Sequence, residues 1–112
     1  MKMHSYFNSR GDDLIQKYIS GLRREEQVDG ADVLNQMEKG EFNTLHVKPW
    51  QGKIFEVYFY KHNRIFYFVN TGSEIYLLHA CRKQRNKTEQ KDVKIIIDRA
   101  KELSKEIGIH IV

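Results

Sequence analysis

The sequence has few of the residues that cross-link, interrupt or anchor a polypeptide chain. Cys81 is the only cysteine and Pro49 the only proline among 112 residues. A single cysteine excludes an internal disulfide and a cysteine-based metal cluster within the chain. The opening residues lack the apolar run of a signal peptide, and no stretch approaches the roughly 20 apolar residues of a membrane span. We therefore expect a cytoplasmic protein with no membrane association.

The length and composition indicate one globular unit. A chain of 112 residues is long enough for one modest hydrophobic core, and we expect a single domain over residues 1–112. Hydrophobic residues make up 40% of the chain and charged residues 30%, as in ordinary folded domains. No repeat, low-complexity segment or linker divides the sequence.

Positive charge is concentrated in the second half of the chain. Residues 1–60 hold eight Lys or Arg and nine Asp or Glu, a net charge of −1. Residues 61–112 hold eleven and six, a net charge of +5. Six of these bases fall within residues 82–94, against two acids. Clustered bases of this kind favour a polyanionic partner, and the alternative is the solvated start of a helix.

Apolar residues at helical spacing predict three helices. The first begins at about Asp12, where Asp12 or Asp13 can cap it, and the second spans residues 27–39 and stops at Gly40. These two form a predicted helical hairpin. The third spans residues 88–107, with Thr88 as its N-cap and Gly108 just past its end.

Between the second and third helices, the sequence has the aromatic and β-branched character of strands. Residues 42–48, 53–60, 64–69 and 74–82 predict four strands, and short connections between them indicate an antiparallel meander. Pro49 should end the first of the four, because proline cannot donate a hydrogen bond within a sheet. Residues 2–7 predict a further short strand at the start of the chain.

The strand pairing decides which side chains are neighbours. If Tyr60 pairs with Arg64, one sheet face holds Glu56, Tyr58, Tyr60, Arg64, Phe66 and Phe68. The other face is almost wholly apolar and should pack on the helical hairpin. If Val69 pairs with Glu74, Arg64 lies opposite His79. The mixed face would then gather Arg64, His79, Tyr58 and Tyr60 beside the basic segment.

Single residues on this face have both functional and structural readings. His79 has a pKa suited to acid–base chemistry, although a lone strand histidine commonly serves the framework. Tyr58 and Tyr60 could stack on a base or simply pack on the sheet. Cys81 reads as a small core residue, and the histidines show no metal-ligand spacing, so we expect no metal.

Four segments, in this order, carry a resemblance to a known family. They are FNSRG at residues 7–11, HVK at 46–48 followed by GKIFEV at 52–57, RIFYFV at 64–69, and IYLLHACRKQRNKT at 75–88. The ordered set resembles the RelE-type toxins of bacterial type II toxin–antitoxin systems, within the RelE/ParE superfamily, and most of all their HigB-like, phage-derived branch. Tyr58 stands where that branch usually has arginine, and Ala80-Cys81 replace its Gly-Phe.

The resemblance implies a fold, an activity and partners. The implied fold class is α+β and RelE-like, with an N-terminal helical hairpin on an antiparallel meander of about four strands and a C-terminal helix. The implied activity is ribosome-dependent, metal-independent cleavage of mRNA with no cofactor, in which a 2′-OH attacks the adjacent phosphate. The implied partners are mRNA on the ribosome and a cognate, HigA-like helix-turn-helix antitoxin, in a heterotetramer that binds its own operator through the antitoxin.

The resemblance also assigns residues. Arg64 matches the family's strand arginine and is expected to contact the scissile phosphate; the alternative is a structural ion pair with Glu56 or Glu74. The catalytic candidates are Arg64, Lys83, Arg85 and His79. The RNA-binding candidates are Arg82, Lys87, Lys91, Tyr58 and Tyr60.

Two other functions fit the same fold. One is a ParE-like toxin that binds DNA gyrase without hydrolysing anything, and the other is a catalytically degenerate protein that mainly binds an antitoxin. An antitoxin could cover the basic edge, or it could bind the helical hairpin around Tyr18, Leu22 and Val33 and exclude the protein from the ribosome.

Overall fold

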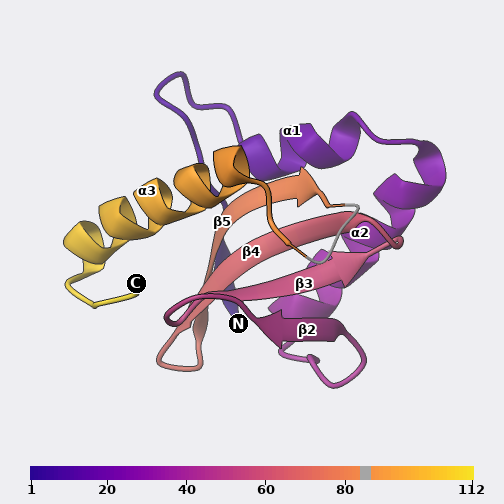
Figure 1. The fold of residues 1–112 in the computed structure, drawn as a ribbon. Helices are drawn as coiled ribbons and strands as arrows, with labels where there is room; N and C mark the ends of the chain where they lie inside the picture. Colours follow the sequence, from indigo (N-terminus) through magenta and orange to yellow (C-terminus); the bar gives the residue numbers. More distant parts are fainter. Residues whose placement is uncertain (84–86) are drawn as a thin grey trace.

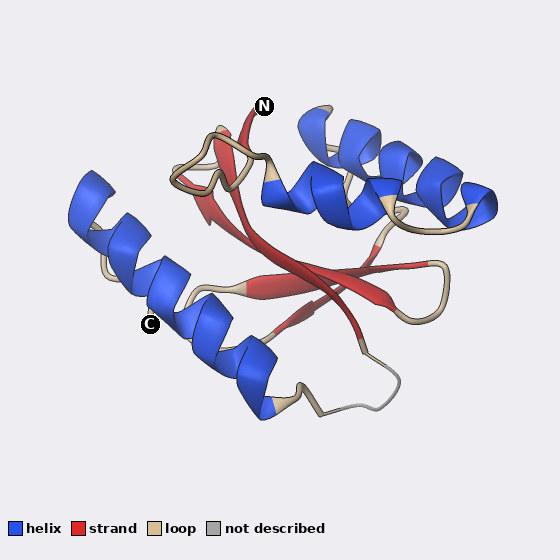
Figure 2. Cartoon of the chain, turned by 90° about the horizontal axis from the view of Figure 1, so that it is seen from above, coloured by secondary structure: helices blue, strands red, loops and turns tan. Residues whose placement is uncertain are grey.

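In a computed structural model, which describes residues 1–83 and 87–112, the chain folds as two helices, a five-stranded sheet and a third helix (Figure 1). The elements are β1 (Lys2–His4), α1 (Leu14–Ser20), α2 (Arg24–Glu38), β2 (His46–Pro49), β3 (Phe55–Phe59), β4 (Asn63–Asn70), β5 (Glu74–Arg82) and α3 (Gln90–Ile107). Helices α1 and α2 cover one face of the sheet and α3 covers the other (Figure 2). The predicted α+β class is confirmed.

The strand order is β1-β5-β4-β3-β2. Strands β2 to β5 form the predicted antiparallel meander, and each pairs with the next along the chain. The predicted first strand, residues 2–7, is shorter than expected, and β1 adds to the free edge of β5 in parallel. β1 is therefore one edge strand of the sheet, and β2 is the other.

One predicted strand was largely wrong. Residues 42–45 form a turn, and only His46–Pro49 pair as β2. Phe42 and Leu45 are apolar because they pack against the core beneath α2, which explains why their sequence read as a strand. Pro49 ends β2 at the sheet edge, where its missing N–H costs no ladder bond.

The helix ends follow local chemistry. Asp13 caps α1 by accepting hydrogen bonds from the backbone N–H groups of Ile15 and Gln16. Helix α2 begins at Arg24, three residues before the predicted start. The N-cap of α3 is Glu89 and not Thr88, because the Thr88 hydroxyl instead accepts a hydrogen bond from Trp50 Nε1 at 3.1 Å.

The predicted β3–β4 register was wrong by two residues, but the predicted faces were right. Arg64 pairs with Tyr58 and not with Tyr60, which lies in the turn with φ of 45°. A shift of two residues keeps the alternation of side chains, so Glu56, Tyr58, Arg64 and Phe66 still share one face. Tyr60 leaves that face because the turn takes it out of the strand.

The β4–β5 register also differs from the prediction. Val69 pairs with Ile75 in place of Glu74, and an irregularity between Phe66 and Tyr67 changes the pairing further along. Arg64 therefore lies opposite Cys81 and not opposite His79, which pairs with Phe66. A bulge of this kind cannot be read from turn lengths alone.

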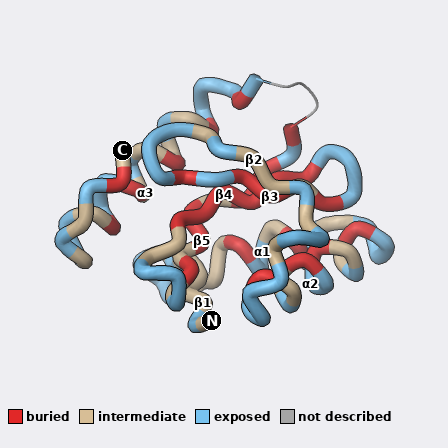
Figure 3. Tube along the Cα trace, turned by 90° about the horizontal axis from the view of Figure 1, so that it is seen from below, coloured by how far each residue is buried: buried red, intermediate tan, exposed pale blue. Residues whose placement is uncertain are grey.

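The sheet has a hydrophobic core on each face, and burial is concentrated along its central strands (Figure 3). The first core packs α1 and α2 against the apolar face, as predicted, and includes Ile15, Ile19, Val33, Met37, Val57, Phe59, Ile65 and Tyr67. The second packs α3 against the mixed face and includes Ile54, Phe66, Phe68, Leu78, Ile96 and Ala100. No helix within the described residues has the length and apolar character needed to cross a membrane.

Candidate functional site

A fully buried carboxylate organises two cations on the mixed sheet face. Glu56, on β3, has no exposed surface, and its two oxygens accept from Lys83 Nζ at 3.1 and 3.3 Å. Arg64 Nε lies 3.4 Å from the same carboxylate, within ion-pair range. The side chains of Arg64 and Lys83 are only 10% and 4% exposed. Two cations share one anion, so the cluster keeps one formal positive charge.

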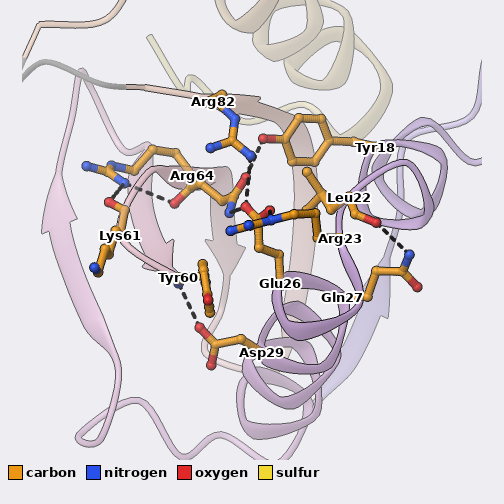
Figure 4. Close-up of polar contacts among 11 residues, drawn as sticks. Tyr18, Leu22, Arg23, Glu26, Gln27, Asp29, Tyr60, Lys61, Arg64 and Arg82 are labelled. Atoms are coloured by element: carbon orange, nitrogen blue, oxygen red, sulfur yellow. Dashed lines mark hydrogen bonds and ion pairs between the residues drawn. The ribbon is translucent and has the colours of Figure 1, made fainter.

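Arg64 is held in one orientation by several groups. Its Nη1 donates to the backbone oxygens of Lys61 at 2.9 Å and Asn63 at 3.0 Å, as Figure 4 shows. The guanidinium lies over the Tyr58 ring, 3.9 Å from its centre. Nε is buried without a hydrogen-bond partner in hydrogen-bonding geometry, and within the described residues Nη2 makes no hydrogen bond. Among the described residues, Nη2 is therefore a guanidinium nitrogen whose hydrogen-bonding capacity is unused.

Tyr58 continues this cationic surface onto the edge strand. Lys48 Nζ lies 5.6 Å from the centre of the Tyr58 ring, and the His46 ring stacks on it at 6.5 Å. Both neighbours come from β2, which pairs with β3. Arg64, Tyr58 and Lys48 thus alternate cation, ring and cation across the sheet, an arrangement that suits phosphates and bases of single-stranded nucleic acid.

A cavity of about 700 Å³ lies where the end of β5 meets α1 and the start of α3. Its lining includes Tyr18, His79, Cys81, Arg82, Lys83, Lys87, Lys91 and Asp92. A second cavity, of about 380 Å³, shares Lys83 and Lys87 with it and extends to Glu56 and Lys48. Lys83 therefore stands between the two spaces. Cations outnumber carboxylates in the lining of both, which favours a polyanion.

Both ring nitrogens of His79 have partners. Nε2 is hydrogen-bonded to the buried carboxylate of Asp92 at 2.8 Å, and Nδ1 lies 3.4 Å from Arg99 Nη1. Burial lowers the pKa of His79 below its ordinary value, and this outweighs the opposing effect of Asp92. The ring is therefore neutral at pH 7, with Nε2–H donating to Asp92 and Nδ1 accepting from Arg99.

His79, Cys81 and Asp92 bring three potential metal ligands within 4.8 Å of one another. Burial raises the pKa of the Cys81 thiol to about 12, so the cysteine is a protonated core residue, as expected. If Nε2 of His79 bound a metal, Nδ1 would carry the proton and face the Arg99 cation, which cannot accept a hydrogen bond. This second layer of contacts disfavours a metal at these residues.

A second buried carboxylate holds Arg82 on the other side of the sheet. Glu26, on α2, is 2% exposed and accepts from Arg82 Nη2 at 2.8 Å, Asn63 Nδ2 at 2.9 Å and Arg23 Nε at 3.2 Å (Figure 4). Tyr18 donates to the same Asn63 side chain. These hydrogen bonds, led by that from Asn63, lower the pKa of Glu26 from 4.5 to about 2.

The predicted site residues do not all meet. Arg64, Tyr58 and His79 share the mixed face, as expected, and Lys83 joins them through Glu56. Tyr60 does not join them: its backbone N–H donates to Asp29 of α2, and its ring lies beside acidic residues.

The basic segment is only partly described. Lys87 and Lys91 are exposed at the rim of the larger cavity, while Arg85 lies outside the described residues. Lys83, a catalytic candidate of this segment, is buried against Glu56.

Three acids organise the site, and sequence reasoning did not give them a role. Glu56 entered as a member of the mixed face and as a possible ion-pair partner of Arg64, while Glu26 and Asp92 entered only the charge count. An acid within a strand of aromatic and β-branched residues, as Glu56 is in FEVYF, is a signal of a buried ion pair. For Glu26 the usable signal was its position on the helix face that also carries Val33 and Met37.

Comparison with known proteins identifies a family for this chain. The model of a family described as phage-derived protein Gp49-like (DUF891) matches residues 17–101, which is about three quarters of the chain. The matched region runs from α1 into α3 and includes every site element described above. No curated protein matches the chain.

Proposed function

The chain belongs to the phage-derived Gp49-like family, which is related to the RelE and HigB toxins, and on this basis we propose that it is a toxin that cuts mRNA on the ribosome. The observation that supports this most is the arrangement of Arg64. It is held on Glu56 and Tyr58, and its Nη2 makes no hydrogen bond to the described residues. Its partner Glu56 lines the smaller cavity, and Lys83, which shares that carboxylate, lines both. A site for a phosphodiester needs such a fixed cation.

In the proposed reaction, the 2′-OH of one nucleotide attacks the adjacent phosphorus and the bond to the next 5′ oxygen breaks. The products are a cyclic phosphate and a free 5′-OH, and the proton of the 2′-OH passes to a base while the leaving oxygen gains one. Arg64 stabilises the charge that grows on the phosphate oxygens, with Lys83 as the second cation. Tyr58 offers a ring for stacking.

The other candidates have lesser parts in this scheme. Arg82, Lys87, Lys91 and Arg85 are proposed to grip the RNA backbone. A catalytic part for His79 requires that its hydrogen bond to Asp92 opens, because both ring nitrogens are engaged. As the toxin of a type II system, the protein would be neutralised by a helix-turn-helix antitoxin in a heterotetramer that binds its own operator.

Expression of the chain in bacteria tests the proposal. Primer extension on a reporter mRNA should show new 5′ ends inside translated codons, while DNA supercoiling stays normal. Arg64→Ala should lower the cleavage rate by about 10²–10³, because a preorganised cation is lost from the transition state. The matched control is Arg10→Ala, which removes an arginine whose side chain is 79% exposed and should leave cleavage unchanged.

Thermal unfolding of both variants shows whether the fold survives. Lys83 still pairs with Glu56 in Arg64→Ala, so that variant should remain folded at assay temperature. Intact mRNA together with gyrase-linked DNA breaks would replace the proposal with the gyrase-binding alternative. Cleavage by a folded Arg64→Ala protein at the wild-type rate would remove Arg64 from the mechanism.

A further inference from the structure

The outer face of α2 carries an acidic groove with an apolar floor. This α2 groove, about 670 Å³ in volume, is lined by Glu25, Val28, Asp29, Ala31, Asp32, Asn35 and Tyr60. Val28 is 64% exposed and Tyr60 38% exposed. They are two of the four large hydrophobic residues exposed among those the structure describes. Two such side chains in one groove form a contact surface and not a scatter of single residues.

Among the described residues, the hydrogen-bond partners of Asp29 and Asp32 in the α2 groove are neutral groups. Asp29 accepts from the Tyr60 backbone N–H at 2.7 Å, and Asp32 accepts from Gln36 Nε2 at 2.9 Å. Across residues 1–83 and 87–112, none of the ion pairs involves Glu25, Asp29 or Asp32. Three formal negative charges therefore surround an exposed aliphatic side chain without a cationic partner in this part of the chain.

The groove continues past α2 toward the sheet edge. An adjoining cavity of about 560 Å³ shares Asp29, Asp32 and Tyr60 with it and reaches His46, Tyr58 and Lys61. Together the two spaces form a channel along α2, in which the three carboxylates outnumber the one lysine, Lys61. The α2 groove itself lies on the α1–α2 layer, whereas α3 lies across the sheet (Figure 2).

The charge of the channel decides the class of its occupant. Three carboxylates repel RNA and DNA, so the polyanion that suits the cationic cavities does not suit this surface. A polypeptide segment that presents Lys or Arg around an aliphatic residue complements both the acids and Val28. Apolar contact at the centre with charge at the rim is the usual anatomy of a protein–protein contact.

We propose that the α2 groove binds a cationic, amphipathic segment of a partner protein, with an aliphatic side chain on Val28 and bases on Asp29 and Asp32. The identity of that partner as the antitoxin rests on the proposed toxin function. The antitoxin surface was expected around Tyr18, Leu22 and Val33 of this hairpin, but Val33 is buried in the core at 5% exposure and cannot contact a partner. Val28 is the valine that α2 offers to a partner.

The probe is a fluorescein-labelled peptide of about 14 residues, with Lys and Leu placed at amphipathic helical spacing. Its binding is followed by fluorescence anisotropy against the full chain. The test variant is Asp29→Asn with Asp32→Asn, which keeps the acceptor oxygens toward Tyr60 and Gln36 and removes two charges. The matched control is Glu102→Gln with Glu106→Gln, which removes two exposed charges from α3.

We expect the α2 double variant to weaken binding by about tenfold or more, and the α3 double variant by less than about twofold. Val28→Ser should also weaken binding, because the aliphatic contact is lost. Equal weakening by both double variants would show that the peptide senses only net charge, and would overturn the proposal. Absence of binding at about 1 mM peptide would overturn it as well.

Messenger RNA cleavage by the α2 variants is measured in parallel and should stay at the wild-type rate. Failure of the wild-type chain to cleave RNA would concern the proposed function alone. Failure of the peptide to distinguish the two faces would concern the groove alone.

Discussion

Replacement of Glu56 by glutamine should destabilise the protein strongly, because it removes an anion that is paired with two buried cations. Glu56 is fully buried, and the Arg64 and Lys83 side chains that it pairs with are 10% and 4% exposed. Loss of one partner from a buried ion pair typically costs about 3–5 kcal/mol, since the remaining charge stays away from water. The free energy of unfolding of a small domain is about 5–15 kcal/mol, so Glu56→Gln should remove a large share of the stability.

Urea unfolding at neutral pH, followed by circular dichroism, measures this loss. A second change, Lys83→Met in the Glu56→Gln background, should recover part of the stability because one uncompensated cation is gone. Arg64 then keeps the carbonyl oxygens of Lys61 and Asn63 as acceptors. The control Glu102→Gln alters an exposed carboxylate and should change the unfolding free energy by less than about 0.5 kcal/mol. A loss below about 1 kcal/mol for Glu56→Gln, or no recovery in the double variant, would refute the buried cluster.

Two further predictions concern the stability of the protein in acid, which depends on Glu26, and the space available at Gly52. Because the pKa of Glu26 is lowered from 4.5 to about 2 in the folded protein, its contribution to stability is present above about pH 4.5 and is lost as the pH falls toward 2. Unfolding measured between pH 5 and about pH 2.5 should therefore be less steeply acid-dependent in Glu26→Gln than in wild type, and equal slopes would contradict the role of Glu26. Gly52→Ala should destabilise the protein more than Gly72→Ala, by about 1.5–3 kcal/mol. Both glycines have positive φ, so the strain of a Cβ on the backbone is common to the two variants. At Gly52, however, the Cβ would also lie 2.2 Å from the backbone oxygen of Ile111 and would displace the buried Ile111 side chain. Equal midpoints in a urea titration would show that the C-terminal segment yields without loss.

The fold was largely predictable because the sheet and helices have different periods. Alternation along residues 53–59 and 64–69 assigned the two faces correctly even though the register was wrong by two residues, and Tyr60 was the exception because it lies in the turn. The 3.6-residue repeat placed α3 to within two residues at its start and exactly at its last residue, Ile107. The face on which a side chain lies is unchanged by such an error, because side chains alternate every residue and a shift of two residues returns each one to the same face.

The parts that could not be predicted depend on contacts between distant residues. The turn at Tyr60 and Lys61 takes positive φ at both positions, which residues of these types seldom adopt. This turn leads into Asn63, which is fully buried and hydrogen-bonded to both Glu26 and Tyr18. As a result β4 begins at Asn63, one residue before the predicted start. The same long-range hydrogen bonds are invisible in local propensity.

The candidate site was predicted as a set of cations, but the structure shows that their positions come from acids. Sequence reasoning could gather Arg64, His79 and Tyr58 on one face, because that requires only alternation. It could not show that Lys83 turns inward to Glu56, since a lysine after a strand is ordinarily solvated. The distinction between a free and a buried lysine needs the tertiary structure.

Arg82 and Lys83 show what this arrangement does for the basic segment. They are adjacent in sequence, yet strand alternation sends them to opposite faces: Arg82 reaches Glu26 on α2, and Lys83 reaches Glu56 on β3. The Lys83 backbone N–H also donates to the His62 oxygen at 2.7 Å. The end of β5 is thus fixed from both layers just before the remaining bases of residues 82–94. The buried carboxylates of Glu26 and Glu56 therefore fix the position of Arg82 and Lys83, where the basic segment begins. Under the proposed function, replacement of either carboxylate should reduce RNA cleavage, although neither needs to touch the substrate.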